Sequence, residues 1–215
     1  MASKEFFSLI GAIIVLTIVF GFSSALESNW SQIALILLFS AIIISLNITS
    51  KKLTAHSLDI DVSHSIWSWS RYGLHPHSHF KNPVPIGIIL PIIISLFSLG
   101  LFKFPAILIY EARALKTRAA KRFGFYSYTE VTEWHNALIG AAGIFSLLLL
   151  ALIAYLLPIS INLELLAKMS VYYTLFNLLP ISNLDGTQIF FGSRVLYSAL
   201  GVITLIFALY ALVLI

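Results

Sequence analysis

The chain contains no cysteine, and only 10% of its 215 residues are charged. Without cysteine, disulfide bonds, thiolate zinc sites and cysteine nucleophiles are all excluded. Soluble domains carry roughly a quarter charged residues and about half apolar ones, whereas 59% of this chain is hydrophobic. A globule of this size keeps much of its surface in water and cannot bury such an apolar excess. The composition therefore predicts an integral membrane protein whose outer surface faces lipid.

The sequence also lacks the features of a protein that binds nucleic acid or nucleotides. Lys and Arg outnumber Asp and Glu by 13 to 9, but these positive charges flank apolar runs, where they determine membrane topology. No Gly-rich phosphate loop and no serine-nucleophile motif is present. We therefore expect the lipid bilayer and other membrane proteins, or their transmembrane segments, as partners, and no nucleic acid.

Long apolar runs divide the chain, taken as a single transmembrane domain of residues 1–215, into membrane segments. A helix needs about 20 apolar residues to cross the hydrocarbon core. The segments are 6–26, 33–48, 86–108, 137–157, 165–180 and 195–215. The predicted fold is an all-α membrane protein with five to six transmembrane or re-entrant helices. Alternating polar and apolar residues predict a short β-like interfacial segment around 58–70.

Segment 86–108 differs from the others because it contains glycine, proline and Lys103. It predicts either a spanning helix interrupted at Pro91 or a re-entrant hairpin. The distribution of Lys and Arg favours the hairpin, because every basic loop then falls on one side of the membrane. The N-terminus of this multi-pass protein is then expected in the cytoplasm.

The most specific motif begins near the end of the fifth segment, as N-x-x-P-x-x-x-L-D-G from Asn177 to Gly186. Pro180 is expected to end or kink the helix, and Gly186 to free the backbone after Asp185. An ionisable residue beside a membrane segment is a functional hypothesis by default. A loop aspartate that caps the next helix is the alternative interpretation.

This motif resembles the second zinc-binding motif of site-2 proteases, which are intramembrane zinc metallopeptidases. The resemblance implies that Asp185 is a zinc ligand and that Asn177 and Pro180 lie where substrate binds. The small-residue run from Gly140 to Gly143 is also similar to a stretch of that family, but it matches only at Gly143. Independently of any family, such a run lets membrane helices approach closely.

The other half of the family's site is altered in this chain. Site-2 proteases carry H-E-x-x-H on a membrane helix, where two histidines bind Zn²⁺ and the glutamate is the general base. The best counterpart here replaces these three residues by Asn47, Ile48 and Lys51. Asparagine is a poor zinc ligand, isoleucine cannot move a proton, and lysine brings a positive charge. We therefore hypothesise that a Lys51–Asp185 ion pair occupies the vacated site.

Other residues provide alternative candidate ligands. Asp61 to His64 resembles the E-x-x-H half of the motif, but it lies in the polar, alternating stretch. His56 and His64 are candidate surrogate ligands together with Asp185. A histidine tract further along alternates as metal ligands do on one face of an extended chain, with a solvated loop as the alternative. It consists of His75, His77 and His79.

These observations lead to three functional hypotheses. The first is a catalytically impaired pseudoprotease of the site-2-protease type, which binds membrane-protein helices without a metal. The second is an active intramembrane zinc metalloprotease with non-standard ligands. The third is a small transporter or channel built around the broken segment 86–108, where polar backbone would line a cavity. Whether the protein is an enzyme stays open, and zinc is expected only if it is active.

Overall fold

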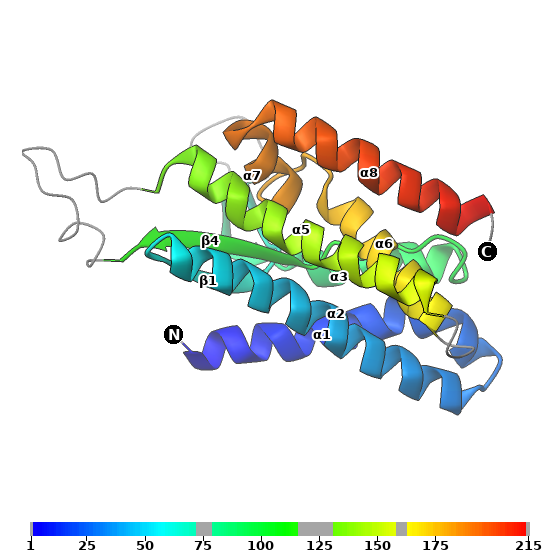
Figure 1. The fold of residues 1–215 in the computed structure, drawn as a ribbon. Helices are drawn as coiled ribbons and strands as arrows, with labels where there is room; N and C mark the ends of the chain where they lie inside the picture. The colour runs from blue at the N-terminus through cyan, green and yellow to red at the C-terminus, as the bar shows by residue number, and fades with distance from the viewer. Residues whose placement is uncertain (1, 72–78, 116–130, 158–162, 214–215) are drawn as a thin grey trace, which may run out of the picture.

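The computed structural model describes residues 2–71, 79–115, 131–157 and 163–213 (Figure 1). These ranges form a mostly helical structure with two small two-stranded sheets. The helices are α1 Ala2–Leu26, α2 Trp30–Ser57, α3 Ile86–Phe97, α5 Glu133–Leu156, α6 Leu163–Asn177, α7 Asp185–Gly192 and α8 Arg194–Val213. The strands are β1 Ile60–Ile66, β2 Trp69–Arg71, β3 His79–Val84 and β4 Leu108–Ala114. His75 and His77 of the histidine tract lie outside the described residues.

Four of these helices are long and apolar enough to cross a membrane, which indicates a multi-pass membrane protein. They are Lys4–Leu26 in α1, Trp30–Ser57 in α2, Glu133–Leu156 in α5 and Arg194–Ala211 in α8. The predicted helical membrane fold is thus confirmed, with these four helices as candidate spans. With 12 and 15 residues, α3 and α6 extend only about 18 and 22 Å, which is short of the ~30 Å hydrocarbon core.

The third apolar segment is not one continuous helix, which agrees with the expectation of a broken rather than a simple spanning segment. Its helix, α3, ends at Phe97, and Leu99 and Gly100 follow with φ of 52° and 80°. The Gly100 N–H donates to the Ser95 carbonyl at 2.8 Å, so a left-handed turn ends the helix. The chain then continues without helix into β4. The last part of the predicted membrane segment, residues 98–107, is therefore non-helical and leads into β4.

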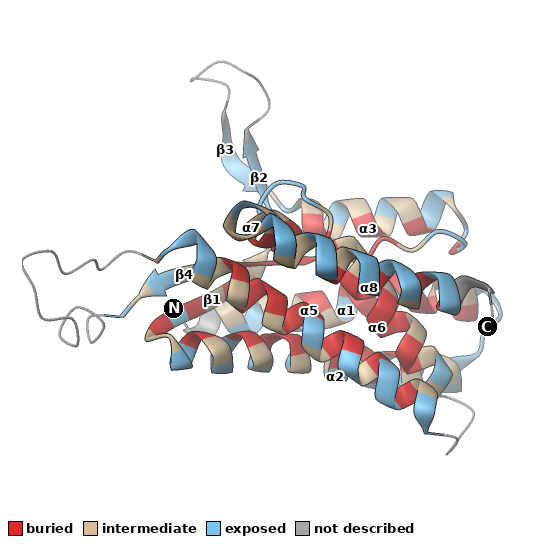
Figure 2. Ribbon diagram, turned by 45° about the horizontal axis from the view of Figure 1, so that its top comes forward, coloured by how far each residue is buried: buried red, intermediate tan, exposed pale blue. Residues whose placement is uncertain are grey.

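The strand predicted around residues 58–70 is present as β1, which pairs with β4 in antiparallel register along its whole length. Its partner β4 was not predicted, and only its first residue, Leu108, lies in the segment that was expected in the membrane. Ile60, Val62 and His64 alternate along β1 and are buried. This face of the sheet packs against the end of α2 and the beginning of α5. The second sheet, β2 with β3, projects from the helices (Figure 2).

Helix α5 is the centre of the packing, because it contacts α2, α6, α7 and α8. In Figure 1 it lies between α2 and α8. Its buried small residues, which allow close helix approach, are Ala137, Gly140, Ala141, Gly143, Ala151 and Ala154. Figure 2 shows buried residues concentrated along α5 and α6, whereas α8 exposes its outer face. That face carries large apolar side chains, as a lipid-facing surface requires.

The helical structure is interrupted between α6 and α7. A turn of residues 178–184 follows α6, and α7 begins at Asp185. The proline of the motif lies in this turn, as predicted. A Cβ added at Gly186 would lie 1.9 Å from the carbonyl oxygen of Leu178. Only glycine therefore fits where the first turn of α7 packs against the preceding turn.

Replacing Gly186 by alanine should lower the free energy of unfolding by about 3 kcal/mol or more, because the added methyl group meets backbone atoms. Gly201→Ala in α8 is the matched control, since nothing lies within 4 Å of a Cβ built at that position. The control should leave the stability unchanged or raise it by up to about 1 kcal/mol through helix propensity. Thermal unfolding in detergent, followed by circular dichroism, measures both. Equal melting temperatures would contradict this packing of α7.

Candidate functional site

Lys51 and Asp185 form a buried ion pair inside the helical bundle. Lys51 Nζ lies 2.6 Å from Asp185 Oδ2, and only 2% and 1% of the two side chains are exposed. The two residues are 134 positions apart in the sequence, on α2 and at the first position of α7. The structure therefore contains the ion pair hypothesised from the altered motif. Burial raises the pKa of the Asp185 carboxyl, and the positive charge of Lys51 opposes that rise.

Helix α2 presents Lys51 because it continues beyond its apolar part to Ser57. Asn47 lies one turn before Lys51, so the two side chains share one face of α2. Both reach the same point on α5. A Cβ added at Gly143 would lie 2.5 Å from Lys51 Cε and 2.8 Å from Asn47 Nδ2. The absence of a side chain at Gly143 thus gives the two polar side chains their room.

Tyr110 on β4 covers the ion pair from the side of the sheet. Lys51 Nζ lies 4.9 Å from the centroid of its ring, within the range of a cation–π interaction. The Tyr110 hydroxyl donates to the Asn136 carbonyl at 2.8 Å, which fixes the ring against α5. Burial, followed by the negative charge of Asp185, raises the pKa of Tyr110 well above its usual value. Tyr110 therefore remains a neutral phenol beside the pair.

Sequence reasoning missed Tyr110, because it lies between the third predicted membrane segment, which ends at residue 108, and the charged stretch that begins at Glu111. A signal was available in the alternation of residues 110–114, which read Tyr-Glu-Ala-Arg-Ala. Such a period of two is typical of a half-buried strand. This alternating pattern is short and follows directly on a continuous apolar run, so it did not stand out as a separate strand.

His64 extends the polar contacts from Tyr110 towards the first helix. It lies opposite Tyr110 in the β1–β4 ladder, and its Nδ1 is 3.3 Å from Glu5 Oε1 on α1. The same carboxylate oxygen accepts from Lys52 Nζ at 2.7 Å. Burial, together with the nearby charge of Lys51, lowers the pKa of His64 to about 3. At neutral pH its imidazole is therefore uncharged.

Three buried polar atoms within the two motifs have no hydrogen-bond partner among the described residues. They are Asn47 Nδ2, Asp185 Oδ1 and Asn177 Oδ1. Buried polar atoms are normally paired, and unpaired ones are concentrated at functional sites. The site thus retains a free amide donor and a free carboxylate oxygen in addition to the ion pair.

The two residues predicted to contact substrate have different environments. Asn177 is 2% exposed, and its Nδ2 donates to the Tyr173 carbonyl at 2.8 Å within α6. Pro180 lies on the exposed part of the turn between α6 and α7. The turn therefore presents residues 180–183 at the surface, whereas Asn177 belongs to the interior. A role in binding for either residue stays a prediction.

Among the described residues, the alternative candidate metal ligands do not gather around Asp185. Asp61 is exposed and His64 is buried, because residues three apart on β1 point to opposite faces of the sheet. The E-x-x-H reading of this stretch, which requires one face of a helix, is therefore wrong. His56 lines a separate pocket of about 450 Å³ with charged side chains of α1, α2, β1 and β4.

The residues present do not fit a zinc centre. A zinc site needs at least three protein ligands from histidine, cysteine or carboxylate. Among the residues described, no three His, Asp or Glu side chains form a group that could hold a metal ion. The position next to Asp185 is taken by the Lys51 ammonium, which repels a dication. Ile48, which the resemblance aligns with the general base, is 7% exposed within the apolar core.

Comparison of the chain with protein-family models, curated proteins and solved structures found no match. Function is therefore inferred from the chemistry of the site and from the motifs that form it.

Lys51→Ala should destabilise the fold by about 3–5 kcal/mol, because it leaves the Asp185 carboxylate buried without its counter-charge. Asp185→Ala should have a similar effect for the converse reason. The double variant should recover much of the loss, since it buries no unpaired charge. Melting temperatures in detergent for the three variants and the wild type complete the cycle.

The exposed pair Arg113–Glu111 is the control for this cycle. Its atoms are 3.1 Å apart and its side chains are 59% and 60% exposed. Arg113→Ala should change the stability by less than about 1 kcal/mol. If the losses of Lys51→Ala and Asp185→Ala add in the double variant, the two side chains are not coupled and the ion pair is refuted.

Proposed function

We propose that the protein is a site-2-protease-like membrane protein without protease activity, which binds the membrane helices of other proteins. The observation that supports this most is the contact between Lys51 and Asp185. Each residue was singled out by a separate partial resemblance, one to the first zinc motif and one to the second. Unrelated segments that resembled these motifs by chance would have no reason to meet inside the bundle.

The ion pair explains how such a fold is maintained without a metal. In a zinc site the cation links the helix of the first motif to the carboxylate of the second. Here the Lys51 ammonium supplies the positive charge from α2 itself and holds Asp185 through a charge-assisted hydrogen bond. The same helices are thus cross-linked, but there is no polarised water and no general base at Ile48. Binding without cleavage follows from this replacement.

The binding surface of this proposal is the exposed turn at residues 180–183, next to the buried site. Ile181 is 41% exposed on this turn. Phe102, which follows α3, is 54% exposed and packs edge to face against Phe176 at the end of α6. Together these side chains offer apolar contacts beside irregular backbone. A client helix that unwinds locally exposes backbone N–H and C=O groups, which can form hydrogen bonds with this irregular backbone. An intact helix already pairs these groups internally.

A cytoplasmic N-terminus belongs to the same proposal. β1 follows α2 directly, and its pairing with β4 brings the chain back to that end of the bundle after α3 and the turn at Gly100. Helix α3, with 12 residues, is too short to carry the chain across. Lys52 near the end of α2 contacts Glu5 near the start of α1, so the basic end of α2 and Lys4 lie on one side. The positive-inside rule assigns that side to the cytoplasm.

The triple variant Asn47→His, Ile48→Glu, Lys51→His should acquire a metal site. Its two new histidines share the face of α2 that meets Asp185, so three ligands of the correct types converge. We expect zinc at close to one equivalent and a cobalt complex with the visible absorption of tetrahedral Co²⁺. The wild type should contain no stoichiometric zinc. Metal analysis and absorption spectroscopy of the purified proteins check this.

Adding Asp185→Ala to the triple variant is the control and should abolish metal binding. A folded triple variant that binds neither zinc nor cobalt would refute the assignment of residues 47–51 to the first motif. Stoichiometric zinc in the wild type that disappears in Asp185→Ala would instead indicate a zinc site that includes Asp185. That result would overturn the pseudoprotease proposal.

Client binding can be tested with a photoreactive benzoylphenylalanine at Ile181. The probe is a synthetic membrane-spanning peptide with a Gly-Pro pair in the middle of a leucine-rich run. We expect it to cross-link more efficiently than the same peptide with leucine in place of Gly-Pro, because only the former unwinds easily. Phe6 on α1, which is 60% exposed, is the control position. Equal labelling of both peptides, or at both positions, would contradict binding at the turn.

A further inference from the structure

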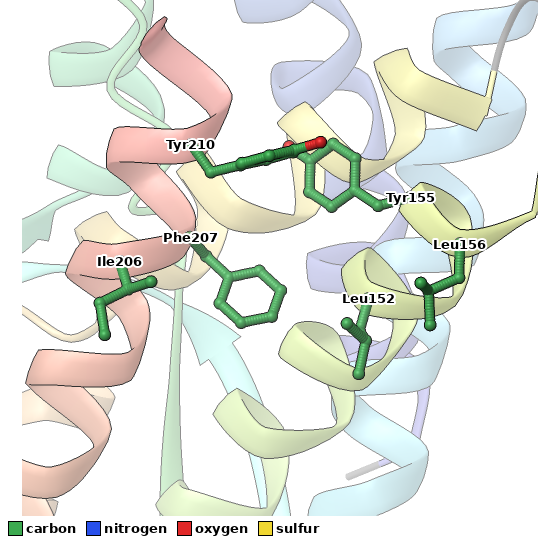
Figure 3. A pocket seen from close by; sticks show the side chains of 6 residues that line it. All are labelled: Leu152, Tyr155, Leu156, Ile206, Phe207 and Tyr210. Carbon is green, nitrogen blue, oxygen red and sulfur yellow. The ribbon is translucent and has the colours of Figure 1, made fainter. Parts of the chain in front are cut away.

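A groove runs between α5 and α8 on the outside of the bundle (Figure 3). Its volume is about 290 Å³, and its wall is almost entirely apolar. The lining residues are Leu152, Tyr155, Leu156, Ile206, Phe207 and Tyr210. Because α5 and α8 are both candidate membrane spans, the groove opens where lipid acyl chains surround the protein.

We propose that this groove binds one phospholipid, with an acyl chain along the apolar wall and the ester region at the tyrosine end. An apolar groove that opens to lipid gains dispersion contacts when it is filled. A methylene group is close in size to a water molecule, which takes about 30 Å³, so the groove holds roughly ten methylene groups. That length corresponds to the upper part of an ordinary acyl chain.

The two tyrosines define the orientation of the bound lipid. Tyr155 is the penultimate residue of α5, and Tyr210 lies in the last turn of α8. Their rings pack edge to face with centroids 5.0 Å apart at one end of the groove (Figure 3). Tyrosines at the ends of spans lie at the membrane interface, at the level of the lipid headgroups. The apolar part of the groove then points into the hydrocarbon core.

Tyr210 is the residue that can anchor the lipid ester. It is 44% exposed at the rim of the groove, and it combines an apolar ring with a hydroxyl that can donate a hydrogen bond. A lipid ester carbonyl accepts hydrogen bonds and cannot donate them. The Tyr210 hydroxyl therefore complements it as a donor. This inference is independent of the metal-site resemblance.

The test is retention of phospholipid by the full chain, released from phosphatidylcholine nanodiscs and measured by native mass spectrometry. Leu152→Trp fills the groove and should reduce the retained lipid at least tenfold. Leu149→Trp is the matched control on the same helix, because the two leucines are 40% and 47% exposed. It should retain lipid like the wild type. Tyr210→Phe should weaken retention about fivefold through the lost hydrogen bond.

Melting temperatures show whether the variants fold, and Ile206→Trp on the opposite wall replaces Leu152→Trp if the latter does not. Equal lipid retention by the Leu152 and Leu149 variants would overturn the site. A wild-type dimer without bound lipid, lost in Leu152→Trp, would assign the groove to a second copy of the chain instead. Unchanged retention in Tyr210→Phe would overturn the role of the hydroxyl.

Discussion

Two opposite charges buried in an apolar bundle constrain the elements that surround them. Lys51 and Asp185 have lost their hydration, and that cost is offset only while their 2.6 Å contact persists. The contact requires α2 to approach α5 at Gly143 and the first turn of α7 to pack closely at Gly186. Displacing either helix would leave a charge unpaired in a medium of low dielectric constant. The two glycines and the helix break can therefore be understood as consequences of one electrostatic requirement.

The sheet completes this arrangement by controlling which other groups near the pair carry charge. Tyr110 turns the face of its ring to the lysine and contributes no formal charge. His64 behind it stays neutral, because protonation would place a second cation near Lys51 in a buried site. The local sum of charges is thus close to zero without any metal. A dication added to this environment would have to displace the ammonium before it could reach the carboxylate.

The candidate spans were predictable from sequence because hydropathy depends only on composition over about 20 residues. The ion pair was predictable because Lys51 and Asp185 stand at motif positions that the resemblance assigns to ligands of one zinc ion. Two such positions are expected to lie close together. The strand β4 was not predictable, since its apolar beginning continues the apolar run of α3, although a left-handed turn at Gly100 and a non-helical stretch separate the two elements. Tyr110 could not be assigned to the site for the same reason, and His64 was considered only as a metal ligand, not as the neighbour of Tyr110. Their place depends on a strand pairing between distant segments, which local patterns do not encode.

The location of the pair along the membrane normal bears on the proposed function. Lys51 lies within the last two turns of α2, which is followed directly by strand β1. The irregular backbone around it, at the α6–α7 turn and before β4, needs hydrogen-bond partners that a lipid core does not supply. A client helix that unwinds faces the same requirement, and the interface lowers its cost because water and exposed backbone groups are within reach. Recognition near one end of the bundle, rather than at its centre, is therefore the arrangement in which a partly unwound helix would be bound most stably.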